Sequence, residues 1–181
     1  IFYNMLTDLY PQFLTIATLH LFAVMSPGPD FALIIRQSLY CNRRASIITS
    51  IGIGTGILFH IFYCIIGLGI IISQSSYLFN LFRICGGLYL IFIGYKSFSK
   101  KLDINMKSDI PKNISSNMNS FLMGLLTNIL NPKATLFFLS LYTFIVNEQP
   151  IIYIQIFYGI WMSLITVLWF CFLSIISGNF I

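Results

Sequence analysis

The sequence has very few charged residues. Only 8% of its 181 residues are Asp, Glu, Lys or Arg, whereas about 25% is usual for a soluble domain. Apolar residues make up 57% of the chain, and the mean hydropathy is +0.87. Because no single soluble core absorbs so much apolar sequence, we predict an all-α polytopic membrane protein. The net charge is +5, but the basic residues are not clustered as they are on a nucleic-acid-binding surface, so no nucleic-acid partner is expected.

The sequence also lacks the residue patterns of a metal site. Its four cysteines show no Cys-x-x-Cys spacing, and its two histidines, His20 and His60, are isolated within apolar runs. Because metal binding needs several ligands around one point, no metal or other cofactor is predicted. We expect the cysteines to be small apolar packing residues and both histidines to be packed or hydrogen-bonded.

Five apolar runs dominate the chain, and each is close to or longer than the ~20 residues that a helix needs to cross a bilayer. Residues 1–12 form a short polar lead. The one long hydrophilic stretch, at 96–120, contains five lysines and many Asn and Ser residues, a composition typical of a linker. The expected spans are residues 13–35, 46–72, 78–95, 121–146 and 151–177.

The distribution of Lys and Arg indicates how the spans are oriented. Eight of the ten basic residues lie in the connectors at 36–44 and 96–120, whereas the connectors at 73–77 and 147–150 hold none. With five spans, both basic connectors fall on the same side of the membrane, which the positive-inside rule assigns to the cytoplasm. We therefore expect a multi-pass protein whose N-terminus lies outside.

Two breaks interrupt the apolar runs, one at Met25-Ser26-Pro27-Gly28-Pro29-Asp30 in the first span and one at Asn131-Pro132-Lys133 in the fourth. A proline removes a backbone donor and clashes with the preceding turn, so each of these spans should be a broken helix. Pro27 and Pro132 lie 105 residues apart. Because three spans precede the fourth, the fourth runs opposite to the first. This arrangement predicts an inverted 3+3 helical repeat with broken first and fourth helices.

The repeat divides the chain into two units. Residues 1–97 form the first three-helix unit, residues 98–118 the cytoplasmic linker, and residues 119–181 the second unit. By the spacing of the two prolines, the second unit should extend about 20 residues, or one span, beyond Ile181. We therefore expect five spans in a chain that is truncated before the third helix of its second unit, either as a fragment or as a natural truncation.

Asp30 is the only carboxylate inside an apolar run. Burial disfavours the charged form of a carboxylate, and a nearby cation favours it. A carboxylate that is both buried and close to a cation is suited to proton coupling or to binding a substrate ammonium. The alternative is a structural role as the N-cap of the half-helix that follows Pro29.

Lys133 is the only lysine inside a span. It can serve as the counter-charge to Asp30 or bind a substrate carboxylate; the alternative is a cation held by backbone carbonyls at the break. Asn128 and Asn131 can bond the carbonyls that Pro132 frees, or contact the substrate. If the two breaks meet at mid-membrane, Asp30 and Lys133 should face each other across a polar cavity with one open flank. The candidate substrate- and ion-binding residues are Pro27, Gly28, Pro29, Asp30, Asn128, Asn131, Pro132 and Lys133.

Four stretches carry a resemblance to a known family. Residues 25–30 resemble the first-helix signature of the LysE/RhtB amino-acid exporters, and Thr127-Asn128-Ile129-Leu130-Asn131-Pro132-Lys133-Ala134 resembles their fourth-helix motif. Gly52-Ile53-Gly54-Thr55-Gly56, which also suits close helix packing, and Gly86-Gly87-Leu88-Tyr89-Leu90 agree with the same family. The resemblance implies six spans in the bacterial cytoplasmic (inner) membrane. It also implies secondary active export of amino acids or their derivatives, coupled to ion entry, with the proton as the favoured ion. The chain departs from the family at its C-terminus.

Other functions stay open beside this one. A metal-cation exporter of the same superfamily would need several acidic or soft ligands at one cavity, where Asp30 stands alone. A membrane enzyme would need paired catalytic groups, and because no Ser–His or two-carboxylate spacing is present, no enzyme activity is expected. A truncated chain could also be a non-transporting remnant. The expected partners are an amino acid and the lipid bilayer, and a homo-oligomer is left open.

Overall fold

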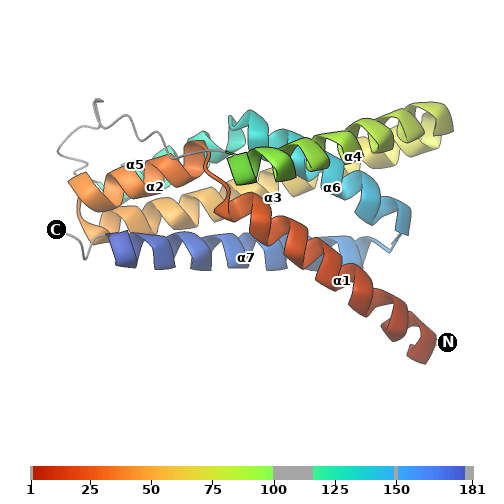
Figure 1. The fold of residues 1–181 in the computed structure, drawn as a ribbon, viewed down its shortest axis with the longest axis horizontal. Coiled ribbons are helices and arrows are strands. Elements are labelled where there is room, and N and C mark those ends of the chain that lie inside the picture. The colour runs from red at the N-terminus through yellow and green to blue at the C-terminus, as the bar shows by residue number, and fades with distance from the viewer. Residues whose placement is uncertain (1, 100–115, 149–150, 178–181) are drawn as a thin grey trace.

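The computed structural model describes residues 2–99, 116–148 and 151–177. Every element in these ranges is an α-helix, and the protein is an all-α polytopic membrane protein, as predicted. Most of the helices run along the long axis of the bundle, and α1 diverges from it toward the N-terminus (Figure 1). The helices are α1 (Phe2–Met25), α2 (Pro29–Tyr40), α3 (Arg43–Gln74), α4 (Ser76–Ser99), α5 (Asn117–Ile129), α6 (Pro132–Glu148) and α7 (Ile152–Ser177).

The first and fourth spans are broken helices, which confirms the prediction from the prolines. α1 and α2 are bent by 53° at their break, and α5 and α6 by 59°. Gly28, in an extended conformation, is the N-cap of α2, and Pro29 occupies the first turn, where a missing N–H costs no hydrogen bond. Pro132 likewise begins α6. The two broken helices run in opposite directions (Figure 1), as an inverted repeat requires.

The other predicted spans correspond to α3, α4 and α7. By length and composition, α3 and α7 can each cross a membrane alone, and each bent pair adds a further span. In the part of α4 whose side chains are described continuously, Ser76–Phe92 is an apolar helix. The expected linker at 98–118 lies largely outside the described residues.

Two boundaries differ from those expected. α1 begins at Phe2, so the polar lead at 1–12 continues the helix of the first span. The first basic connector is also shorter than expected, because only Cys41 and Asn42 separate α2 from α3. The side chain of Asn42 accepts a hydrogen bond of 2.7 Å from the backbone N–H of Ala45, and this cap starts α3 early.

α3 lies at the centre of the bundle and packs against α2, α4, α5, α6 and α7. Its contact with α5 is close because glycines face the opposite backbone. A Cβ on Gly52 would overlap the carbonyl oxygen of Phe121, and one on Gly124 would overlap that of Thr49. The hydroxyl of Thr49 donates a 2.9 Å hydrogen bond to the carbonyl of Ser120 across the same contact. The prediction of close packing is therefore confirmed at Gly52, and Gly124 is a further close contact that was not predicted.

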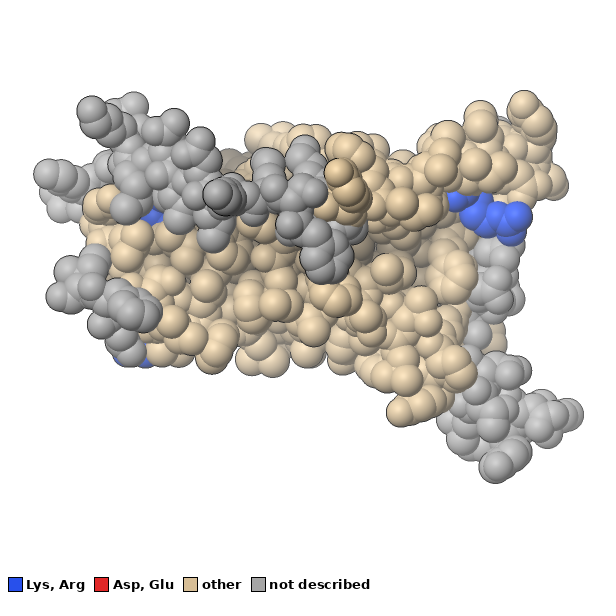
Figure 2. Space-filling model, viewed as in Figure 1, with Lys and Arg blue, Asp and Glu red and all other residues tan. Residues whose placement is uncertain are grey.

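The buried apolar side chains form two clusters. The larger cluster joins α1, α3, α6 and α7 through twelve buried residues. The smaller cluster consists of Ile34, Ile53 and Phe170. Much of the outer surface is apolar too, with large side chains such as Phe62 and Leu88 exposed. Over the face drawn in Figure 2, described basic residues lie near the ends and none over the middle, as expected for a lipid-facing surface.

Candidate functional site

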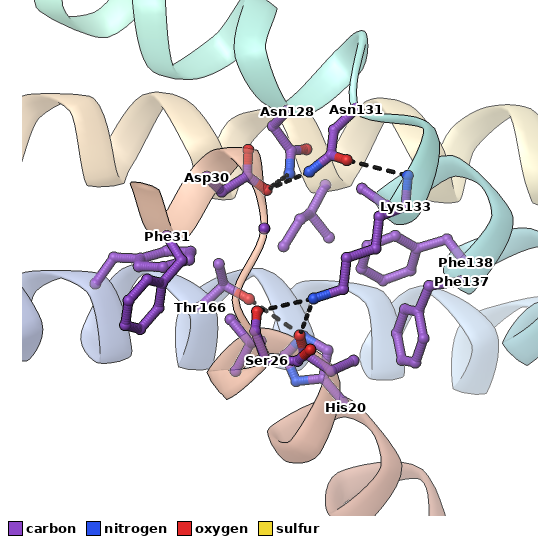
Figure 3. A pocket seen from close by; sticks show the side chains of 16 residues that line it. His20, Ser26, Asp30, Phe31, Asn128, Asn131, Lys133, Phe137, Phe138 and Thr166 are labelled. Carbon is purple, nitrogen blue, oxygen red and sulfur yellow. Dashed lines mark hydrogen bonds between the residues drawn. The ribbon is translucent and has the colours of Figure 1, made fainter. Parts of the chain in front are cut away.

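The two helix breaks meet in the bundle. One carboxylate oxygen of Asp30, Oδ2, accepts hydrogen bonds of 2.8 Å from the amide of Asn128 and 3.1 Å from the amide of Asn131 (Figure 3). Asp30 lies in the first turn of α2, where the helix dipole favours a negative charge. The two asparagines come from the end of α5 and the break that follows it. This geometry confirms the prediction that the breaks lie together, and it shows that Gly28, not Asp30, is the N-cap of α2.

Lys133 makes the corresponding connection from the other half. It lies in the first turn of α6, and its ammonium donates hydrogen bonds of 3.1 Å to the carbonyl of Ala23 and 2.8 Å to that of Ser26. These carbonyls belong to the C-terminal end of α1 and the residue that follows it, where the helix dipole favours a cation. Lys133 is thus a cation held by the break carbonyls, and it borders the same pocket as Asp30.

The two asparagines do not bond the carbonyls at the break of α5 and α6, which was the structural role expected for them. Their amide groups donate to Asp30, and the side-chain oxygen of Asn131 accepts a 3.0 Å hydrogen bond from the backbone N–H of Lys133, which caps α6. The carbonyl of Asn128 bonds the Nε2 atom of His60 at 3.0 Å instead. His60 also bonds the hydroxyl of Tyr63 at 2.6 Å, so it is hydrogen-bonded, as expected.

A pocket with a cavity volume of about 50 Å³ lies between the breaks. Five predicted residues line it: Gly28, Asp30, Asn128, Asn131 and Lys133. Pro27, Pro29 and Pro132 are not among the lining residues, because they act by ending and starting the helices. The prediction that Asp30 and Lys133 border one cavity is confirmed, but the wall of this cavity is mainly apolar and not polar as expected (Figure 3).

Sequence reasoning missed much of the pocket wall. His20 of α1 and Thr166 of α7 line it, and their side chains are 3.1 Å apart in a hydrogen bond between Nε2 and Oγ1. Aromatic side chains complete the wall, among them Phe31, Phe137, Phe138 and Phe170. In the sequence, His20 was the signal that could have pointed to this part of the wall, because a polar residue within an apolar run needs a buried hydrogen-bond partner.

Several buried polar atoms at the pocket are unpaired. Within the described part of the chain, Oδ1 of Asp30, Oδ1 of Asn128 and Nδ1 of His20 have no hydrogen-bond partner. Burying such an atom unpaired costs about 1–3 kcal/mol, so these positions have capacity to bond a solute or water. Among the described residues, no three His, Cys, Asp or Glu side chains are grouped so that they could hold a metal ion.

Comparison with known proteins identifies the family. The model of the LysE type translocator family matches residues 21–181. The chain belongs to the LysE type translocator family. It is 34% identical over 139 residues to the threonine efflux protein of Escherichia coli K12, a match that covers 76% of this chain and 68% of that protein. It is also 34% identical over 163 residues to the uncharacterized membrane protein YrhP of Bacillus subtilis, covering 83% of this chain and 75% of the relative. No solved structure matches the chain. The expected resemblance is therefore confirmed: the family is one of translocators, and one of the two named relatives is an efflux protein.

Proposed function

We propose that this translocator is a secondary active exporter of a small amino acid or an amino-acid derivative. The observation that carries the proposal is the placement of a carboxylate, Asp30, and an ammonium, Lys133, on the walls of one pocket. A zwitterionic amino acid carries the complementary pair of charges. The relatives named threonine efflux proteins support this solute class.

The two ends of the solute would bind at the two helix breaks. Its ammonium would approach the unpaired oxygens of Asp30 and Asn128, which are both hydrogen-bond acceptors. Its carboxylate would lie beside Lys133 in the first turn of α6, where the helix dipole favours an anion. Each charged end of the solute would thus exchange its hydration shell for fixed protein groups whose charge or partial charge has the opposite sign.

The remaining wall suits a small side chain with a hydroxyl group. Phe137 and Phe138 of α6 present apolar rings to the pocket. His20 of α1 and Thr166 of α7 supply hydrogen-bonding atoms. Threonine, with one methyl and one hydroxyl group, is complementary to such a mixed surface. We therefore propose hydroxylated amino acids, threonine among them, as the preferred solutes.

We further propose that the exporter is coupled to proton entry through Asp30. Protonation of this carboxylate would remove the negative charge that holds the solute ammonium and the amides of Asn128 and Asn131. The proposed location is the bacterial cytoplasmic membrane with the N-terminus outside. The proposed units are residues 1–97 and 119–181, joined by a cytoplasmic linker at 98–118.

Counterflow in proteoliposomes tests this function. Vesicles that contain the purified protein and unlabelled threonine should accumulate labelled threonine, and Lys133→Gln should reduce the rate at least tenfold. Arg83→Gln is the matched control, because this exposed cation lies on α4 away from the pocket and should leave the rate unchanged. Failure of threonine, serine and alanine to exchange above the level of protein-free vesicles would refute amino-acid transport. Normal exchange by Lys133→Gln would refute the binding site.

A further inference from the structure

A single apolar layer separates the pocket from one end of the bundle. The three side chains of the smaller apolar cluster form this layer, and they are at most 2% exposed. The pocket residues Asp30, Ile57 and Thr166 each lie four residues, about one helical turn, from a member of the layer. The members of this layer, hereafter the triad, are Ile34 of α2, Ile53 of α3 and Phe170 of α7.

Beyond the triad, the same faces of the same three helices become polar while staying buried. Gln37 follows Ile34 on α2, Ser46 and Ser50 precede Ile53 on α3, and Ser174 follows Phe170 on α7. These four side chains, hereafter the polar layer, are all 0% exposed. Along each of these three helices, moving away from the pocket, a pocket-lining residue is therefore followed by a buried apolar side chain and then by a buried polar one. Serine is common where membrane helices pack closely, so it is the buried polar atoms without a partner that call for an explanation.

Three atoms of the polar layer have unused hydrogen-bonding capacity. Within the described residues, Oε1 of Gln37, Oγ of Ser46 and Oγ of Ser174 are buried and have no hydrogen-bond partner. Native structures pair nearly all such atoms with protein or with a bound molecule. The unpaired atoms come from all three helices around the layer, and each can bond water or a solute; the amide Nε2 of Gln37 donates to the sulfur of Met123 on α5 at 3.3 Å.

On α3 the apolar stretch on the opposite side of the pocket is longer. There the larger apolar cluster extends along α3 from Ile57 to Leu68, about 16 Å, compared with about 6 Å for the single turn at the triad. On α1, in contrast, buried Ile16 lies one turn from the pocket residue His20, and Gln12, whose buried Nε2 has no partner among the described residues, lies one turn further. Along α3 the shorter apolar stretch thus lies toward the end that carries the exposed residues Arg43 and Arg44, hereafter the basic end.

We propose that the solute passes between α2, α3 and α7, that the polar layer is a second binding site on this route, and that the triad is the gate between the two sites. This inference rests on the proposed transport function. The polar layer offers hydroxyl and amide groups but no full charge, so it suits the hydrated head of a small zwitterion on its way to the charged pocket. α2 is a separate half-helix joined to α1 through Ser26–Gly28, so it can move away from α7 while α1 stays in place.

Thiol labelling from the two sides of the membrane tests the gate without requiring transport. Ser26→Cys, in a background without the four native cysteines, places one thiol on the pocket wall. A charged, impermeant thiol reagent is added from the basic end, using vesicles of known orientation. Adding Ile53→Ser should raise the labelling rate from this side at least tenfold and leave the rate from the opposite side unchanged.

Ile145→Ser is the matched control, because Ile145 is also 0% exposed but belongs to the larger cluster. It should not raise labelling from the basic end. An unchanged rate with Ile53→Ser, or an equal rise with Ile145→Ser, would overturn the gate. If Ile53→Ser does not insert into the membrane, Phe170→Ala provides the same test, with Leu141→Ala as its control. Because labelling does not depend on the solute, a protein that fails to exchange amino acids can still confirm or refute the gate.

Discussion

The ammonium of Lys133 donates a 2.8 Å hydrogen bond to the carbonyl of Ser26, which connects the first turn of α6 to the end of α1. Asp30 makes the reciprocal connection from the first turn of α2 to Asn128 near the end of α5. Each half-helix that begins at a proline therefore uses a charged residue to bond the broken end of the other span. The same groups stabilise the fold and border the pocket, so the proposed transport site lies where the two broken spans meet.

Asp30→Asn should abolish proton-dependent efflux and preserve membrane insertion. Asparagine has nearly the same shape, and its carbonyl oxygen can still accept hydrogen bonds from Asn128 and Asn131, but it cannot ionise. Efflux from proteoliposomes under an imposed pH gradient should fall at least tenfold and lose its pH dependence. Efflux with wild-type rate and pH dependence would leave Asp30 with a structural role only.

Lys133→Met should destabilise the protein by about 1–3 kcal/mol, because it removes the ammonium that donates to the carbonyls of Ala23 and Ser26 and leaves them without this charged donor. Thermal unfolding in detergent, followed by circular dichroism, measures the change. Lys133→Arg retains the charge and should recover most of the stability; an equal loss in both variants would mean that side-chain shape, not charge, decides the effect.

Gly124→Ala should destabilise the bundle by about 1–3 kcal/mol, because the added Cβ would overlap the carbonyl oxygen of Thr49 and push α3 and α5 apart. Gly67→Ala is the control. A Cβ there meets no atom within 4 Å, so this change should be neutral or stabilise α3 by about 0.5–1 kcal/mol. Similar unfolding temperatures for the two variants would contradict the close packing of α3 against α5.

Thr166→Val should reduce exchange of threonine about 3–10-fold while leaving that of alanine nearly unchanged. Valine keeps the shape of threonine but removes the hydroxyl that bonds His20, which corresponds to about 1 kcal/mol of hydrogen bonding. Thr55→Val is the matched control, because that hydroxyl bonds the carbonyl of Ile51 within α3. Competition between labelled threonine and unlabelled alanine measures the preference, and an equal loss for both solutes would argue against side-chain recognition at Thr166.

Lys107→Cys should be labelled only from the cytoplasmic side. This position lies in the basic stretch at 96–120, outside the described residues, and the positive-inside rule places it in the cytoplasm. An impermeant maleimide applied to intact cells should not react, whereas the same reagent should react after the cells are permeabilised. Reaction in intact cells would reverse the proposed orientation and place the basic end outside.

The sequence by itself determined the helices, their breaks and the charged residues at those breaks. Span length and proline position are local properties of the chain, so they predict the breaks between α1 and α2 and between α5 and α6. Asp30 and Lys133 could be selected because a charge within an apolar run is costly and stands out in the sequence. The same reasoning could not tell which carbonyls or amides these charges would bond.

Only the tertiary structure decided which residues meet across the bundle. His20 and Thr166 are 146 residues apart in the chain, and Ile34, Ile53 and Phe170 come from three separate helices. Such contacts depend on the rotation and the register of each helix against its neighbours. In this protein they are set by the close approach at Gly52 and Gly124 and by the bends of 53° and 59°. Apolar runs that look alike in sequence can pack in many registers, so the pocket wall and the triad emerge only when the helices are assembled.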